Sequence, residues 1–151
     1  MLESHDYDVT VTGTGAKTGL LEAPLDDLPE LEVSSPPEFG GPDGVWSPEH
    51  LFVAAVASCL MTTFRSIATN SGIEVLDYVD HSTGQLRRAE DGLYSIERVT
   101  LRPMVVISGD SKPERALRLL DKAERVCLIG RSISSEVVLD PTVVQAHHVG
   151  T

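Results

Sequence analysis

The chain contains two cysteines, Cys59 and Cys127, and these are its strongest candidates for chemistry. Taken singly, each reads as a small buried apolar residue, which is the usual state of a free cysteine. Taken together they fit thiol redox chemistry, because a cysteine oxidised by peroxide to a sulfenic acid needs a second thiol to resolve it before it is oxidised further. Their separation of 68 residues excludes a Cys-x-x-Cys motif.

A thiol in the middle of a helix would need a nearby positive charge to become reactive, because the helix dipole acts only near helix ends. Lys17 is the only lysine or arginine among the first 64 residues. Glu49 fits two interpretations, a favourable charge at a helix N-terminus or a partner for Lys17. Arg125 and Arg131 flank Cys127 and could lower the pKa of that thiol, although cations near a helix C-terminus need no further explanation.

The histidine and the remaining arginine near Cys59 are weaker candidates. His50 could act as a base or a ligand, but in the first turn of a helix it is more often a solvated side chain. Cys59, His50 and Cys127 would make a poor zinc site, because no fourth ligand is indicated and none has the usual close spacing. Arg65 follows Cys59 by six residues, so it lies on another helical face and reads as a solvent or dimer contact. We therefore expect no metal.

Residues 48–70 carry the pattern of a helix with Cys59 near its middle. Ser47 is a good N-cap, and Pro48 suits the first helical position. Apolar side chains then recur close to every 3.6 residues, which predicts a packed central helix. Residues 70–72, Asn-Ser-Gly, supply a C-terminal stop.

Short β-like runs surround this helix and a second one. The predicted strands cover residues 6–14, 18–23, 30–35, 73–87, 94–107 and 134–140, with 73–87 and 94–107 as an antiparallel hairpin. A helix is predicted over residues 113–126, which places Cys127 at its end, and the Pro- and Gly-rich residues 36–44 read as a loop. The order βββ-α-ββ-α-β alternates too little for a doubly wound parallel sheet. It predicts an α+β fold, an antiparallel sheet with two main helices.

Length and composition limit the remaining choices. With 151 residues and 41% hydrophobic content, the chain fits a single domain over 1–151, with a core of about 6–140 and a weakly ordered tail over 141–151. The net charge of -11 argues against nucleic acid as a partner. No stretch approaches the roughly 18 to 20 apolar residues of a membrane span, and the N-terminus lacks a signal-peptide pattern. We therefore expect a cytoplasmic protein with no membrane partner.

The segment Ser47-Pro-Glu-His-Leu-Phe-Val-Ala-Ala-Val-Ala-Ser-Cys59-Leu-Met-Thr resembles the helix signature of the OsmC/Ohr family of peroxide-reducing proteins. In that family the Pro-Glu pair opens a central helix, and a cysteine ten residues after the Glu is the peroxidatic thiol. Glu49 and Cys59 meet that spacing. The family's second cysteine also follows a helix, as Cys127 does, and the order of elements agrees over roughly residues 6–140.

This resemblance implies an OsmC-like fold in an intertwined homodimer, with active sites at the subunit interface. It implies a thiol peroxidase for organic hydroperoxides, and possibly hydrogen peroxide, in which Cys59 and Cys127 form a disulfide. Lipoyl or another small thiol would reopen that disulfide, and no cofactor is needed. The implied site residues are Cys59, Cys127, Glu49 and Lys17. The apolar side chains Phe52 and Val56, one or two turns from Cys59, favour organic hydroperoxides over hydrogen peroxide.

The chain departs from the family pattern in ways that keep two other functions open. Similar peroxide reductases carry an Arg in an N-terminal Gly-rich turn, where this chain has Lys17, and Lys lacks the planar fork of Arg. Leu128 follows the second cysteine where similar proteins often have Pro, and residues 24–44 are unusually acidic and Pro-rich. One alternative is a redox sensor or a binding protein for a small acidic ligand. The other is a structural dimer with inert cysteines.

Overall fold

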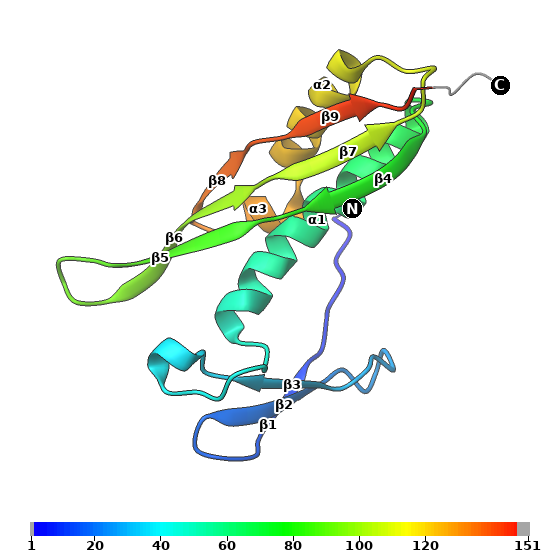
Figure 1. The fold of residues 1–151 in the computed structure, drawn as a ribbon. Helices are drawn as coiled ribbons and strands as arrows, with labels where there is room; N and C mark the ends of the chain where they lie inside the picture. The colour runs from blue at the N-terminus through cyan, green and yellow to red at the C-terminus, as the bar shows by residue number, and fades with distance from the viewer. Residues whose placement is uncertain (1, 148–151) are drawn as a thin grey trace. The chain divides into compact units, whose positions relative to one another are not determined.

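The structure, a computed structural model, describes residues 2–147, and its internal contacts divide the chain into two compact units. The first unit covers residues 1–51, and the second covers residues 52–151. The helix α1 (Pro48–Asn70) begins in the first unit and continues into the second (Figure 1). The single-domain expectation remains a prediction.

The first unit contains the three strands predicted before the helix. They are β1 (Thr10–Gly13), β2 (Thr18–Glu22) and β3 (Leu31–Ser34), and they pair antiparallel in the order β1-β2-β3 (Figure 1). After β3, the loop predicted over residues 36–44 contains a short 3-10 helix, η1 (Pro37–Phe39). The chain then returns to the sheet, where the Ser34 N–H donates to the Trp46 carbonyl at 2.9 Å. The residue after Trp46 caps α1.

The bounds of α1 agree with the predicted helix, and the local signals explain both ends. The Ser47 hydroxyl accepts a hydrogen bond from the His50 N–H at 3.1 Å, which is the N-cap bond expected of a serine at this position. At the other end Gly72 adopts a φ of 74°, and the Ile73 N–H bonds back to the Ala68 carbonyl at 2.9 Å. A left-handed glycine with such a bond is a common way for a helix to end.

The 23 residues of α1 are long and apolar enough, by length and composition alone, to cross a membrane. The core helix of a soluble protein passes the same test, so this finding is weak evidence for a span. Four of its side chains, at every fourth position, are buried inside the second unit: Val56, Leu60, Phe64 and Ala68. The expectation of no membrane partner remains a prediction.

Through residue 147, the second unit adds six strands and two further helices to α1. Their bounds are β4 (Val75–Asp80), β5 (Thr83–Arg88), β6 (Tyr94–Leu101), β7 (Pro103–Ile107), α2 (Pro113–Val126), α3 (Leu128–Arg131), β8 (Glu136–Leu139) and β9 (Thr142–Gln145). They form two three-stranded sheets, β4-β7-β9 and β5-β6-β8. The predicted hairpin is confirmed, because β4 pairs antiparallel with β7 and β5 with β6. The α2 bounds also match the prediction.

Each long predicted strand is interrupted once, and hydrogen bonds across the hairpin stabilise both interruptions. The Asp80 carboxylate accepts from the Arg102 N–H at 2.8 Å and from the Ser82 hydroxyl at 2.6 Å. The Arg102 guanidinium donates to the His81 carbonyl and to the Thr83 hydroxyl. These bonds replace the ladder bonds that a continuous pair of strands would make. The residue 73–87 run therefore becomes β4 and β5, and the 94–107 run becomes β6 and β7.

Two sequence predictions need correction at the C-terminal end. The sheets are mixed rather than antiparallel, because β8 pairs parallel with β6 and β9 pairs parallel with β7. Residues 142–145 were assigned to a weakly ordered tail, but they form β9 and complete a sheet. Residues 148–151 of that predicted tail lie outside the described residues. The helix α3, directly after Cys127, was not predicted.

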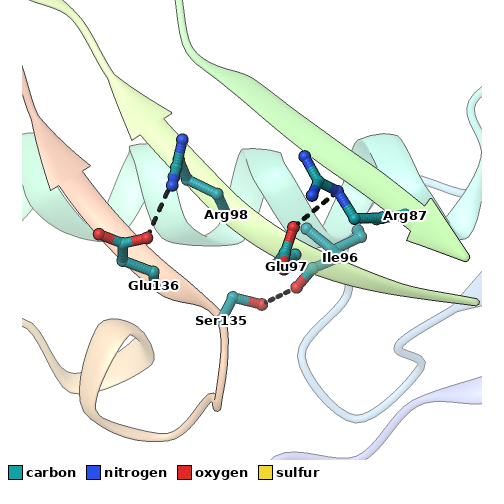
Figure 2. Close-up of polar contacts among 6 residues, drawn as sticks. All are labelled: Arg87, Ile96, Glu97, Arg98, Ser135 and Glu136. Atoms are coloured by element: carbon teal, nitrogen blue, oxygen red, sulfur yellow. Dashed lines mark hydrogen bonds and ion pairs between the residues drawn. The ribbon is translucent and has the colours of Figure 1, made fainter. Parts of the chain in front are cut away.

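Side chains hold the parallel pairing of β6 with β8 in register. Arg98 and Glu136 lie directly opposite each other, and their side chains form an ion pair at 3.1 Å (Figure 2). The Ser135 hydroxyl, just before β8, donates to the Ile96 carbonyl (Figure 2). Exposed ion pairs contribute little to stability, so their main effect here is to fix which residues face each other.

The core of the second unit lies between the helices and the strands. Figure 1 shows α2 behind strands β7 and β9. Fully buried side chains from α1, β6, β7 and α2 meet there: Val56, Leu60, Phe64, Val99, Leu101, Val105, Ile107, Ala116, Leu120 and Ala123. Burial of each valine, leucine, isoleucine or phenylalanine side chain in this cluster contributes roughly 1.5–3 kcal/mol to stability. The cluster therefore fixes α1 and α2 against the strands. Both cysteines are carried by these two packed helices or their ends.

Candidate active site

The two cysteines lie on different elements of the second unit. Cys59 is in the middle of α1 and is partly buried. Cys127 is 3% exposed and lies between α2 and α3, serving as the C-cap residue of one and the N-cap residue of the other. Both are free thiols. The core that packs α1 against α2 therefore decides whether the two sulfur atoms meet.

The two thiols do meet, and further donors surround Cys59. The Cys127 side chain lies close enough to Cys59 for each thiol to shift the pKa of the other. The backbone N–H groups of Leu128 and Ile129, which begin α3, also lower the pKa of Cys59 as hydrogen-bond donors. On α1 itself, the Thr63 hydroxyl lies 3.9 Å from Cys59 Sγ. Cys59 therefore has donors from two helices.

These contacts change the two thiols in opposite directions. Burial alone raises the pKa of Cys59, but hydrogen bonds from Cys127, Ile129, Thr63 and Leu128 together bring that pKa below its ordinary value. Burial raises the pKa of Cys127, and the hydrogen bond that its thiol makes to Cys59 raises it further. Donors favour the charged form of the group that accepts from them, and the donating group keeps its proton. The pair thus combines a thiolate-prone Cys59 with a proton-holding Cys127.

Neither arginine that flanks Cys127 lowers the pKa of that thiol, which corrects two sequence interpretations. Arg125 was a candidate for lowering the pKa of Cys127, but that pKa is raised, and Arg125 pairs instead with Asp121 at 3.4 Å. Arg131 is exposed and does not contribute to the pKa of Cys127. Within one chain, hydrogen-bond donors are the groups that lower the pKa of Cys59, and the expected role of Lys17 remains a prediction.

A buried tyrosine also lies within electrostatic reach of Cys127. The Tyr78 hydroxyl is buried without a hydrogen-bond partner, and its ring centroid lies 6.0 Å from that of Phe64. Burial, then the charges of Asp80 and Cys127, raise the Tyr78 pKa. Tyr78 therefore stays neutral near neutral pH and adds no negative charge beside the thiol pair.

The other two predicted site residues, Lys17 and Glu49, do not form an ion pair with each other among the described residues. The Lys17 ammonium donates to the Phe39 carbonyl at 2.7 Å. Its backbone carbonyl accepts from the Ser34 hydroxyl at 3.0 Å, which holds the Gly-rich turn against β3. One carboxylate oxygen of Glu49 is buried without a hydrogen-bond partner. The interpretation of Glu49 as a partner for Lys17 is not supported by these contacts.

No contact joins His50 or Arg65 to either cysteine among the described residues. The His50 ring nitrogen Nδ1 lies 2.6 Å from the Ser47 hydroxyl, so this histidine belongs to the N-cap of α1. Arg65 is exposed, as predicted for a residue on another face of the helix. Among residues 2–147, no group of three or more His, Cys, Asp or Glu side chains is placed to hold a metal ion.

Sequence reasoning missed the donors to Cys59. A signal for Thr63 was present, because residues four apart on a helix lie on the same face. The N–H groups of Leu128 and Ile129 had no such signal, since the short helix α3 was not predicted. The contact between the two cysteines themselves was implied by the family resemblance and could not be derived from their spacing.

Comparison with known proteins shows which family shares the sequence and fold of this chain. Residues 41–142 match the sequence pattern of OsmC-like proteins. An uncharacterized protein of Bacillus subtilis, YmaD, is 30% identical over 110 residues, which is 71% of this chain and 73% of that protein. The chain therefore belongs to the OsmC-like protein family.

Solved structures confirm the predicted OsmC-like fold. An OsmC-like protein of unknown function from Vibrio cholerae is 29% identical, covers 91% of this chain and 99% of its own, and has a TM-score of 0.83. An organic hydroperoxide resistance protein, OsmC, from Legionella pneumophila is 26% identical, covers 93% and 98%, and has a TM-score of 0.69. The chain is thus similar in structure to hydroperoxide resistance proteins.

Proposed function

We propose that this protein is a thiol-dependent peroxidase that reduces organic hydroperoxides through Cys59 and resolves the product with Cys127. The observation that carries the proposal is that the two thiols are close enough to interact, with the pKa of Cys59 lowered and that of Cys127 raised. A nucleophilic thiol must be ionised, and a resolving thiol must be close to it. Similarity to hydroperoxide resistance proteins supports the same chemistry.

In the first step, the Cys59 thiolate attacks the outer oxygen of a hydroperoxide ROOH. A sulfur–oxygen bond forms and the O–O bond breaks, which leaves Cys59 as a sulfenic acid and releases RO⁻. That alkoxide takes up a proton and leaves as the alcohol ROH. Sulfur is oxidised by two electrons, and the peroxide is reduced by two.

In the second step, the Cys127 sulfur attacks the Cys59 sulfenic sulfur. The sulfur–oxygen bond breaks as the disulfide forms, and the oxygen leaves as water with the proton that Cys127 carried. The interaction between the two thiols supports this step, since it places them near each other before the reaction. A fast second step protects Cys59 from irreversible overoxidation.

A dithiol reductant would close the cycle by two exchange reactions, giving back both protein thiols and becoming a disulfide itself. We propose lipoyl or another small thiol for this role, in the cytoplasm, as the family resemblance implies. No metal or organic cofactor enters the proposed reaction.

We also propose that the protein acts as an intertwined homodimer with its active sites at the subunit interface. Lys17 and Glu49 would then take part in a site completed by two copies of the chain. The buried Glu49 oxygen without a hydrogen-bond partner supports this proposal, because buried polar atoms normally find one. Sedimentation equilibrium would test the dimer, and a monomer at micromolar concentration would contradict it.

The apolar surroundings of Cys59 support a preference for organic hydroperoxides over hydrogen peroxide. Phe52, on the same face of α1, is only partly buried, whereas Val56 is 1% exposed and belongs to the core. Of the two residues suggested by the sequence, Phe52 is therefore the one that could contact an apolar substrate. Comparable turnover of both kinds of peroxide would contradict this preference.

The experiment that tests the proposed function is the intact mass of the reduced protein after one equivalent of an organic hydroperoxide. We expect the wild type to lose two hydrogen atoms, Cys127→Ser to gain one oxygen atom, and Cys59→Ser to keep its mass. An unchanged mass in all three proteins would exclude the peroxidase. It would favour a binding protein of the same fold.

A further inference from the structure

Thr63 is a side chain of α1 that forms a hydrogen bond with the sulfur of Cys59. It lies four residues after Cys59, and its hydroxyl oxygen is 3.9 Å from Sγ. Both side chains are partly buried. Residues with this spacing lie on the same face of a helix, so the contact follows from α1 alone and persists whatever α3 does.

Other hydroxyl groups of α1 behave differently. The usual partner of a serine or threonine inside a helix is a backbone carbonyl three or four residues earlier. Ser58 donates to the Ala55 carbonyl at 3.3 Å, and Thr69 donates to the Arg65 carbonyl at 2.9 Å. Thr63 instead directs its hydroxyl to the cysteine sulfur.

Thr62 explains part of this difference. Its hydroxyl donates to the Cys59 carbonyl at 3.2 Å, which is one of the two carbonyls three or four residues before Thr63. Threonine is also stiff, because two heavy atoms on Cβ restrict χ1 to few rotamers. The Thr63 hydroxyl is thus held on the side of the helix that carries the Cys59 sulfur. Thr62 provides a matched control, since it is an adjacent threonine that bonds to the backbone of the same cysteine.

A hydroxyl beside a cysteine favours the thiolate over the thiol, because a thiolate accepts the hydroxyl proton strongly. Cys127 gives up its proton when the disulfide forms and regains it only when the disulfide is reduced. The Thr63 hydroxyl is not consumed at any step of the proposed cycle.

We propose that Thr63 is a positioning residue for Cys59, whose hydroxyl donates a hydrogen bond to the thiolate and fixes its sulfur for attack. This inference rests on the proposed function for its catalytic meaning. The geometric claim, that Thr63 governs the reactivity of Cys59, can be tested without any peroxide.

The test uses Cys127→Ser protein, in which Cys59 is the only thiol, and measures the rate of its alkylation by iodoacetamide from pH 5 to 10. Thr63→Val removes the hydroxyl and keeps the side-chain shape, Thr63→Ser restores a hydroxyl, and Thr62→Val is the control. Hydrogen bonds to charged groups are worth more than those between neutral groups, so Thr63→Val should slow alkylation near neutral pH about three- to tenfold. Thr63→Ser and Thr62→Val should react at nearly the unsubstituted rate.

The variants also separate this inference from the proposed function. Equal rates for Thr63→Val and unsubstituted protein, or a Thr63→Ser rate as low as that of Thr63→Val, would overturn the inference. The same proteins are then mixed with an organic hydroperoxide, and loss of the free thiol is followed. If the alkylation order holds but no protein reacts with the hydroperoxide, the peroxidase fails and the role of Thr63 stands.

Discussion

Replacing Cys127 should reduce the reactivity of Cys59, although Cys127 is not the residue attacked. The Cys127 thiol has the largest effect among the donors that lower the pKa of Cys59 against the effect of burial. A hydrogen bond to a charged group contributes roughly 1.5–3 kcal/mol, and a thiol is a weak donor, so we take the lower limit. Since about 1.4 kcal/mol corresponds to a tenfold change, Cys127→Ala should slow alkylation of Cys59 about tenfold near neutral pH.

The full pH dependence of the alkylation rate separates two effects of this substitution. Cys127 is only 3% exposed, so removing its sulfur opens space and changes access to Cys59. Access alters the rate plateau at high pH, whereas loss of the donor moves the midpoint to higher pH. Cys127→Ser keeps a hydroxyl donor and should move the midpoint less than Cys127→Ala. An identical midpoint in Cys127→Ala and wild type would refute the role of the thiol–thiol hydrogen bond.

Two further predictions concern stability. Burial, then the charge of a neighbouring aspartate, raises the pKa of Glu124, so its ionised form destabilises the folded state and its protonated form does not. Glu124→Gln should therefore stabilise the protein at neutral pH by less than about 1 kcal/mol. This gain in the free energy of unfolding should vanish as the pH falls through the Glu124 pKa, and urea unfolding at several pH values measures it. Leu120 is fully buried, so Leu120→Ala should lower the free energy of unfolding by about 2–5 kcal/mol in the same assay.

Both stability predictions have matched controls on α2. Glu114 lies in the first turn of the helix, where a negative charge is favourable, so Glu114→Gln should not stabilise the protein. Leu117 is 38% exposed, so Leu117→Ala should cost under about 1 kcal/mol. A gain from Glu124→Gln that persists in acid would contradict the pKa argument. Equal losses for the two leucines would contradict the placement of the core.

The helices could be predicted closely because their end signals are local. Ser47 caps α1 through a bond to a residue only three positions away, and Gly72 ends it with a left-handed conformation. The strand partners could not be predicted in this way. The parallel pairing of β9 with β7 depends on tertiary packing, and the four residues Thr142–Gln145 are too short a run to be recognised after a proline.

The candidate site was predicted only in part for a related reason. Cys59 and Cys127 were identified from their residue type and from the family resemblance. Sequence reasoning expected charged side chains to set the pKa values of the two thiols, and for Arg125 and Arg131 this expectation was wrong. The main donors besides Cys127 are backbone N–H groups and a threonine hydroxyl. Backbone groups carry no signal in the sequence, and their positions depend on the short helix α3.

The C-terminal strands also have a consequence for synthesis of the chain on the ribosome. The central strands β6 and β7 each need a parallel partner that is made much later, as Glu136 follows its partner Arg98 by 38 residues. Until Gln145 has emerged, one edge of β6 and one edge of β7 remain unpaired. An open strand edge can pair with another chain, and the β7 segment Met-Val-Val-Ile carries no charge to prevent this. Nascent or prematurely terminated chains that lack β8 and β9 are therefore the form of this protein most exposed to aggregation.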